Sequence, residues 1–309
     1  MGSPLRLTFG REAGDHVAQG AGWHAVVDEF ELAETAMSRF RDTSEITALN
    51  RTAGTGAVAR PSRRLRSALV AADRAQRISG GRFDPRVLLD LDRLGYRGAP
   101  VGPERPADGS KRPEPPMQHR QIEGRVVERH GRHDLSIAQP IDLGGIGKGL
   151  TLRWATDRLE RSGARAFLLE AGGDLVTRGP DPDGMPWRIG IEDPAGGDDL
   201  AVIAVSDLAV ATSSIQVNRW DVDGRTVHHL LDPRTGEPGD GGLLAVTVAG
   251  PDPAWAEVWS KVLFLGGRDT IATDARSRGL AAWWVADDGS LEMTAAARAL
   301  TIWVAAEAA

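Results

Sequence analysis

The chain has 309 residues, and its 37 Lys and Arg against 43 Asp and Glu leave a formal net charge of −6. Nucleic acids and acidic membranes are held mainly by clustered positive charge, so this balance argues against a partner of either kind. The absence of cysteine excludes disulfides, thiolate metal sites and a cysteine nucleophile. No stretch reaches the roughly 18 apolar residues of a membrane-spanning helix. The first residues lack the apolar segment of a secretory signal, which predicts a cytoplasmic protein.

The N-terminal part of the sequence predicts one short strand at 5–9 followed by helices. Apolar residues recur with a 3.6-residue period and predict a helix over 24–41; they are Val26, Phe30, Ala33, Met37 and Phe40. Asp42, with Glu45 three residues later, resembles a capping box for a second helix that carries Ile46 and Leu49.

A third helix is expected to begin after Ser62, whose hydroxyl is a favourable N-cap, and to end at Gly80 and Gly81. Its apolar side would hold Leu65, Leu69, Ala72 and Ala75. Residues 98–120 combine prolines with charges and show almost no apolar periodicity. This composition predicts a mobile surface loop. We expect the loop to lie within a single domain of residues 1–309.

The remainder of the sequence alternates short apolar runs with turns. These runs predict strands at 137, 167–170, 175–177, 188–191, 202–205, 244–248 and 282–285. Helices are expected near 150–162, 254–265 and 269–278. Helices at the front, followed by strands with a few crossovers, indicate an α+β fold.

The most informative segment reads Ile141-Asp-Leu-Gly-Gly-Ile-Gly-Lys-Gly149 and runs into a helix. Glycines let a backbone approach a ligand closely, and the N–H groups at a helix start attract anions. Lys148 adds a positive charge, so the segment is predicted to cradle a phosphate. It matches neither the Walker A pattern nor GxGxxG, and a glycine-rich structural turn stays open as the alternative.

Two other glycine-containing segments carry candidate chemistry, and each also has a structural explanation. Glu170-Ala-Gly-Gly-Asp174 fits a tight hairpin between two strands. Ser79-Gly-Gly-Arg-Phe-Asp-Pro85 fits the end of a helix and an extended turn.

Two pairs of titratable residues are the other candidates. His228 and His229 precede a turn of Asp-Pro-Arg-Thr-Gly, and an imidazole is the usual general base near neutral pH. A structural or chance histidine pair stays open as the alternative. Glu257 and Lys261 are four residues apart on a predicted helix, where an ordinary helical salt bridge would explain both.

The order and spacing of these segments resemble the ApbE family of FAD:protein FMN transferases over nearly the whole chain. The matching segments are, in chain order, Met1-Gly-Ser3, Ser38-Arg-Phe40 with Asp42, Ser44-Glu-Ile46 and Asn50, Gly81-Arg-Phe-Asp84, Ile141 to Gly149, Ala171-Gly-Gly-Asp174, Ala211-Thr-Ser213 and His229 to Gly236. The resemblance implies an α+β fold of the ApbE type, related to the T-fold, with mixed sheets and packed helices.

Members of that family bind FAD and transfer its FMN half to a Thr or Ser hydroxyl of a partner flavoprotein, with release of AMP and with Mg²⁺ at the pyrophosphate. The resemblance therefore implies FAD, Mg²⁺ and an acceptor flavoprotein for this chain. His229 would lie by the pyrophosphate and take the proton of the acceptor hydroxyl, and Gly145 would offer its carbonyl to the metal. The residues implied to bind FAD are Met1, Phe40, Arg82, Phe83, Asp84, Asp142, Gly144, Lys148, Gly173, Asp174, Ser213 and Leu231.

The sequence departs from the family's pattern where the family places its metal ligands, because its Asp and Thr are replaced by Glu257 and Lys261. The Glu257 carboxylate suits Mg²⁺ and is the second candidate catalytic group. A protonated Lys261 cannot bind a metal, and would instead stand in for the cation or pair with Glu257. Ser214 also replaces a glycine of the family's pattern. These departures leave two alternatives open: an FAD- or nucleotide-binding homologue without FMN transfer, and a repurposed flavin-pocket enzyme.

Overall fold

The computed structural model describes residues 4–11, 16–96, 124–216 and 218–306. The chain divides into two compact units, and each unit is described by itself. Of the described residues, unit 1 comprises 32–96, 124–147 and 218–239, and unit 2 comprises 4–11, 16–31, 148–216 and 240–306. The single domain expected from the sequence stays a prediction, and the expected loop at 98–120 lies outside the described residues.

The helices of unit 1 bury the apolar positions that the sequence marks. They are α2 (Glu45–Asn50), α3 (Arg63–Ile78) and α4 (Leu88–Arg93). Ser62 caps α3 as predicted, because its Oγ accepts a hydrogen bond from Leu65 N–H at 3.3 Å. The expected apolar side of α3 is buried, at Leu65, Leu69, Ala72 and Ala75.

The cap predicted for α2 is wrong. Ser44, not Asp42, is the N-cap, and its Oγ accepts a hydrogen bond from Thr47 N–H at 3.2 Å. Glu45 does not close a capping box, since its Oε2 accepts from Ser62 N–H at 2.7 Å. The helix itself and its buried Ile46 and Leu49 are confirmed.

The first helix, α1 (His16–Met37), begins before the predicted residue and ends four residues short of Arg41. It ends there because the Ser38 carbonyl accepts hydrogen bonds from Ser44 Oγ at 2.6 Å and from Arg41 N–H at 3.4 Å. Those bonds replace the helical one. Phe40 therefore lies beyond the helix and is 55% exposed, not part of the helix's buried stripe.

Small antiparallel ladders complete unit 1. The pairs are β2 (Glu128–Arg129) with β3 (Leu135–Ser136), β9 (Arg219–Val222) with β10 (Arg225–His228), and β11 (Leu231–Asp232) with β12 (Glu237–Pro238). A small apolar cluster joins α4 to these ladders through Leu91, Leu94, Val227 and Leu231.

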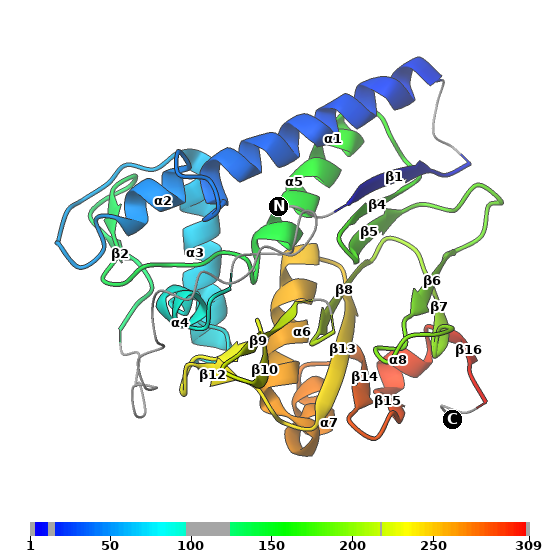
Figure 1. The fold of residues 1–309 in the computed structure, drawn as a ribbon. Coiled ribbons are helices and arrows are strands. Elements are labelled where there is room, and N and C mark those ends of the chain that lie inside the picture. The colour runs from blue at the N-terminus through cyan, green and yellow to red at the C-terminus, as the bar shows by residue number, and fades with distance from the viewer. Residues whose placement is uncertain (1–3, 12–15, 97–123, 217, 307–309) are drawn as a thin grey trace. The chain divides into compact units, whose positions relative to one another are not determined.

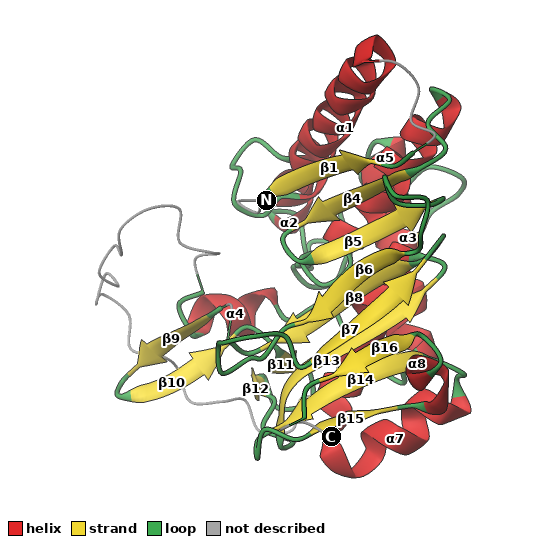
Figure 2. Ribbon diagram, turned by 90° about the vertical axis from the view of Figure 1, so that its right-hand side faces the viewer, coloured by secondary structure: helices red, strands yellow, loops and turns green. Residues whose placement is uncertain are grey.

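Unit 2 is built on a seven-stranded antiparallel sheet in the order β1-β4-β5-β8-β13-β14-β15. Figure 2 shows these strands side by side. Their bounds are β1 (Leu5–Phe9), β4 (Phe167–Ala171), β5 (Asp174–Arg178), β8 (Ala209–Ser214), β13 (Leu243–Gly250), β14 (Ala281–Ala286) and β15 (Leu291–Met293). The hairpin predicted at 170–174 is confirmed: Gly172 and Gly173 form its two-residue turn with φ of 58° and 86°, where glycine fits without strain.

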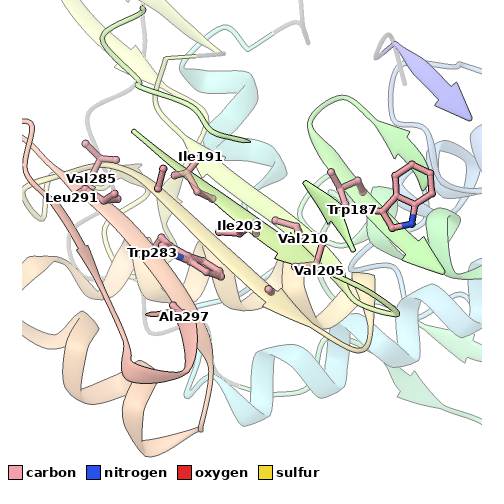
Figure 3. Close-up of a cluster of buried hydrophobic side chains, with 12 residues drawn as sticks. Trp187, Ile191, Ile203, Val205, Val210, Trp283, Val285, Leu291 and Ala297 are labelled. Atoms are coloured by element: carbon pink, nitrogen blue, oxygen red, sulfur yellow. The ribbon is translucent and has the colours of Figure 1, made fainter. Parts of the chain in front are cut away.

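A second sheet of unit 2 has the order β16-β7-β6. Its strands are β6 (Trp187–Ile191), β7 (Ala201–Val205) and β16 (Thr301–Val304). Side chains from both sheets form one apolar cluster, in which Trp283 of β14 is fully buried together with Ile203 of β7 (Figure 3). The Trp283 indole N–H donates to Thr301 Oγ1 at 3.0 Å, which satisfies its polar atom inside the core.

The helices of unit 2 are the C-terminal part of α5 (Gly147–Arg161) together with α6 (Pro253–Gly266), α7 (Arg268–Ser277) and α8 (Ala295–Arg298). Helix α6 packs along β8 and β13 of the large sheet (Figure 1). The mixed sheets and packed helices confirm the predicted α+β class. Among the described residues, no helix combines the length and the apolar composition needed to cross a membrane.

Candidate functional site

Two lysines and two carboxylates lie together in unit 2, and we refer to Lys148, Asp174, Glu257 and Lys261 as the charged cluster. Lys148 lies in the first turn of α5, and Asp174 opens β5. Glu257 and Lys261 lie one turn apart on α6. The chain has three lysines in all, so two of them meet in this one place.

Each carboxylate of the charged cluster contacts a lysine and a backbone N–H. The Lys148 ammonium forms an ion pair with Asp174 Oδ2, and Asp174 Oδ1 accepts from Thr212 N–H at 3.1 Å. Glu257 Oε2 accepts from Gly149 N–H at 2.8 Å, and Lys261 Nζ lies 3.5 Å from Glu257 Oε1. The helical Glu–Lys pair expected from the sequence is therefore present. Its meeting with Lys148 and Asp174 is a tertiary contact that no local pattern indicates.

Burial within the cluster is uneven. The side chains of Asp174 and Glu257 are only 3% and 1% exposed, whereas those of Lys148 and Lys261 are 24% and 17% exposed. The ammonium groups therefore form the accessible side of the cluster, and the carboxylates lie behind them. Burial raises the pKa of the Glu257 carboxyl, and the charge of Asp174 acts in the same direction, while both ammonium groups and the Gly149 N–H oppose the rise.

Close packing of two helix starts brings Gly149 to Glu257. A Cβ added at Gly149 would lie 2.6 Å from the Cα of Ala254, closer than atoms can pack. This glycine is therefore needed because α5 contacts the beginning of α6. Its N–H, one of those left unpaired at a helix start, is satisfied by Glu257 from the neighbouring helix.

The buried Ser213 connects β8 to α6. Its Oγ lies 2.8 Å from Ser260 Oγ, and Ser260 Oγ donates to the Glu257 carbonyl at 2.9 Å. These bonds hold the turn of α6 that carries Glu257 and Lys261 against β8. The family resemblance implies FAD binding by Ser213, whereas its contacts here support a positioning role.

In unit 1 the glycine-rich loop is organised by its own aspartate. Asp142 Oδ1 accepts from Gly144 N–H at 2.6 Å, and Asp142 Oδ2 lies 2.8 Å from Arg39 Nε. A Cβ at Gly144 would approach Asp142 Oδ1 to 2.8 Å, so the Asp142 side chain would have to shift. The Gly144 N–H is thus occupied within the loop, so at this residue the structural-turn alternative accounts for the geometry better than a phosphate cradle does.

Arg39 joins a ring cluster in unit 1, which consists of Phe40, Tyr96, Trp220 and His229. Its guanidinium lies 4.5 Å from the Phe40 ring centroid and 5.2 Å from that of Tyr96. The Tyr96 ring stacks on Trp220 at 5.2 Å and on His229 at 6.0 Å, with interplanar angles of 29° and 22°. Tyr96, Trp220 and His229 are half-buried, with Tyr96 stacked on the other two rings, and Phe40 is the exposed ring of the cluster.

The two histidines of the predicted pair have different surroundings. The His228 ring is engaged at both nitrogens, because its Nε2 lies 3.0 Å from the Gly239 carbonyl and its Nδ1 accepts from Leu230 N–H at 3.3 Å. His229 instead presents its ring to Tyr96. The structure therefore separates a structural histidine from His229, the one expected to act as a base.

Several other residues expected to bind FAD are buried or have partners within the protein. Phe83 and Leu231 are buried, at 5% and 4% exposure. Asp84 forms a buried ion pair with Arg86, with 2.7 Å between Asp84 Oδ2 and Arg86 Nη2. Gly173 lies in the hairpin turn, and Met1 lies outside the described residues. Their roles toward FAD, like those of Arg82 and of Gly145 toward a metal, stay predictions.

Three residues in or beside the ring cluster could not be found from the sequence motifs alone. Arg39 lies inside a matched motif that predicts no role for it, and Tyr96 and Trp220 lie outside every motif. Tyr96 is the chain's one tyrosine, which is the only signal that could have drawn attention to it. Its carbonyl accepts from Arg39 Nη2 at 3.0 Å, and the Trp220 indole N–H donates to the Leu94 carbonyl at 2.6 Å.

The donor set around Glu257 does not fit a divalent cation. Mg²⁺ needs about six oxygen ligands at roughly 2.1 Å, and no group of three or more His, Asp or Glu side chains in the described part of the chain is placed to hold a metal ion. Three of the four carboxylate oxygens of the charged cluster already face an ammonium or a backbone N–H within hydrogen-bond distance. The fourth, Glu257 Oε1, faces the Lys261 ammonium, which would repel a second cation.

Comparison with known proteins places these features in a family. The model of the ApbE family matches residues 1–284. An FAD:protein FMN transferase of Klebsiella pneumoniae is 30% identical over 178 residues, which are 56% of this chain and 50% of that protein. One from Haemophilus influenzae is 26% identical over 259 residues, covering 81% of this chain and 73% of the relative. The chain thus spans about half the length of the first of these relatives.

The fold also matches that of solved structures. The crystal structure of the flavinyl transferase ApbE of Pseudomonas stutzeri superimposes with a TM-score of 0.79 at 25% sequence identity. The match covers 97% of this chain and 94% of that one. It supports the α+β architecture of the ApbE type that the motifs implied.

Proposed function

Because the chain belongs to the ApbE family, we propose that it is an FAD:protein FMN transferase, which moves the FMN half of FAD onto a Thr or Ser hydroxyl of an acceptor flavoprotein and releases AMP. The charged cluster carries this proposal: two ammonium groups form its accessible side, backed by buried carboxylates. Such an arrangement suits a diphosphate, whose negative charge it would counter. A cytoplasmic location stays a prediction of the sequence.

The reaction breaks the phosphoanhydride bond of FAD and forms a phosphoester bond to the acceptor. The acceptor hydroxyl oxygen forms a bond to the phosphorus of the FMN half, and the bond from that phosphorus to the oxygen of AMP breaks. Phosphoryl-type transfer depends on positioning and on countering charge more than on covalent help from the protein. In unit 2, Lys148 and Lys261 would counter the charge that builds up on the phosphate oxygens.

Two further roles in the proposed reaction are expected of residues in unit 1. The exposed Phe40 ring, with the Arg39 guanidinium over it, would contact the flavin or adenine ring. His229 would receive the proton of the acceptor hydroxyl on an imidazole nitrogen as the new bond forms. The stacking of His229 on Tyr96 would fix the orientation of the imidazole ring during that proton transfer.

The direct test is transfer itself. The purified protein is incubated with FAD and a flavoprotein acceptor with an exposed target Thr, and the acceptor band of a denaturing gel is read by flavin fluorescence. A fluorescent acceptor band supports the proposal, and an acceptor whose Thr is replaced by Val is the control. FAD retained by the protein without any labelled acceptor would instead favour a binding homologue.

Lys148→Ala is expected to weaken FAD binding by about 1–3 kcal/mol, the scale of one charge-assisted contact. The loss also leaves the buried Asp174 without its ammonium partner. Equilibrium dialysis with FAD measures the change. Arg188→Ala, which removes the same charge from an exposed position on β6, is the matched control and should bind FAD as the parent does. Equal affinity of Lys148→Ala and parent would remove Lys148 from the binding site.

A further inference from the structure

One oxygen of the charged cluster is incompletely satisfied. Glu257 Oε1 is buried and accepts no hydrogen bond from any described residue, and Lys261 Nζ lies 3.5 Å away. A buried carboxylate oxygen without a donor is costly unless a cation is close. Glu257 therefore depends on the Lys261 ammonium for its charge balance, and it in turn holds that ammonium in place.

The Lys261 ammonium can also reach outward. It has three N–H donors, and its side chain is 17% exposed, while the Glu257 side chain beneath it is 1% exposed. At most one donor is needed for Glu257 Oε1, so the others are available to a ligand on the accessible side. Lys148, which pairs with Asp174, is also partly exposed, at 24%.

We propose that the Lys261 ammonium serves this chain as a built-in cation, which binds the FAD diphosphate directly in the place of a divalent metal ion. The inference rests on the proposed function for the identity of the ligand. Its support is the geometry: two ammonium groups balance two buried carboxylates, and the one open carboxylate oxygen is next to Lys261. A fixed ammonium supplies positive charge and hydrogen-bond donors without a set of metal ligands.

The first experiment uses the parent protein and reads binding, not transfer. FAD binding is measured by equilibrium dialysis in EDTA and in excess Mg²⁺, and Mn²⁺ binding by the loss of the free-ion EPR signal. We expect the same FAD dissociation constant in both buffers and no tight Mn²⁺ binding. An FAD affinity that collapses in EDTA, or stoichiometric Mn²⁺ binding, would overturn the proposal, as would a parent protein that binds no FAD.

The second experiment compares two variants of Lys261. Lys261→Thr removes the ammonium and leaves a hydroxyl beside Glu257, so FAD binding should weaken by about tenfold or more in EDTA and recover in Mg²⁺. Lys261→Met removes the charge and adds no oxygen donor, so the same loss should not be recovered. If both variants bind FAD like the parent in EDTA, Lys261 does not contact the diphosphate.

The results expected if FMN transfer is wrong differ from those expected if the role of Lys261 is wrong. A parent that binds FAD in EDTA, loses affinity in Lys261→Met and labels no acceptor would contradict FMN transfer while supporting the role of Lys261. A parent that labels the acceptor only with Mg²⁺ would support transfer and contradict that role. If Lys261→Thr does not fold, the metal-free binding of the parent still decides the question.

Discussion

His229→Ala is expected to lower the rate of FMN transfer by about 10²–10⁴-fold, the usual contribution of a general base, while FAD stays bound. The reason is the contrast between the two neighbouring rings. His228 is engaged at both nitrogens by backbone groups, whereas His229 lies in the ring cluster against Tyr96. Single-turnover transfer to an acceptor, read as in-gel fluorescence over time, measures the rate.

Two further variants separate proton transfer from stacking. His229→Phe keeps a flat ring against Tyr96 but has no basic nitrogen, so its transfer rate should fall as far as that of the alanine variant. His228→Ala should lower the free energy of unfolding, because it removes the contacts with Gly239 and Leu230. Its transfer rate should stay near that of the parent. Transfer by His229→Phe at the parental rate would place the base elsewhere.

Asp84→Ala is expected to destabilise the protein by about 3–5 kcal/mol, the cost of breaking a buried ion pair from one side. Asp84 and Arg86 have side chains that are each 2% exposed. Asp84 Oδ1 accepts from the Arg86 backbone N–H and from its Nε, both at 2.9 Å. Removing the carboxylate would leave a guanidinium buried without its charge partner. Urea unfolding of the two proteins measures the difference.

The double variant Asp84→Leu with Arg86→Met is the control for this second prediction. It removes both charges and fills a similar volume, so it should cost much less than the single change. FAD dialysis with the double variant then tests the other role expected for Asp84. A single variant as stable as the parent would show that the ion pair does not stabilise the fold. A folded double variant that no longer binds FAD would support the predicted role of Asp84 in FAD binding.

The sequence by itself determined several of the helices and strands. A strand at 5–9, the helix after Ser62 and the hairpin at 170–174 follow from local rules, namely alternation, capping and the demand of a two-residue turn for glycine. Helices α5, α6 and α7 and the strands around them lie within a few residues of the predicted ranges. The cap at Asp42 and the end of α1 were predicted wrongly because neighbouring groups compete for the same hydrogen bonds, and only the folded chain decides between them. The strand predicted at Ile137 is also wrong, since β3 covers Leu135–Ser136. The sequence prediction missed α4, α8 and the central strand β8.

The tertiary structure decided what the motifs are for. The glycines of 141–149 predict that the backbone lies close to another group, which the sequence suggests is a ligand. In the structure, Gly149 lies close to the start of α6, and Gly144 lies close to the Asp142 side chain. Glu257 and Lys261 read as a helical pair, yet packing of α5 on α6 and pairing of β5 with β8 bring them to Lys148 and Asp174. Such contacts join residues far apart in the chain, and local propensity carries no information about them. The charge of each group was readable from the sequence, whereas its burial and its partner, which set its chemistry, were fixed only by the fold.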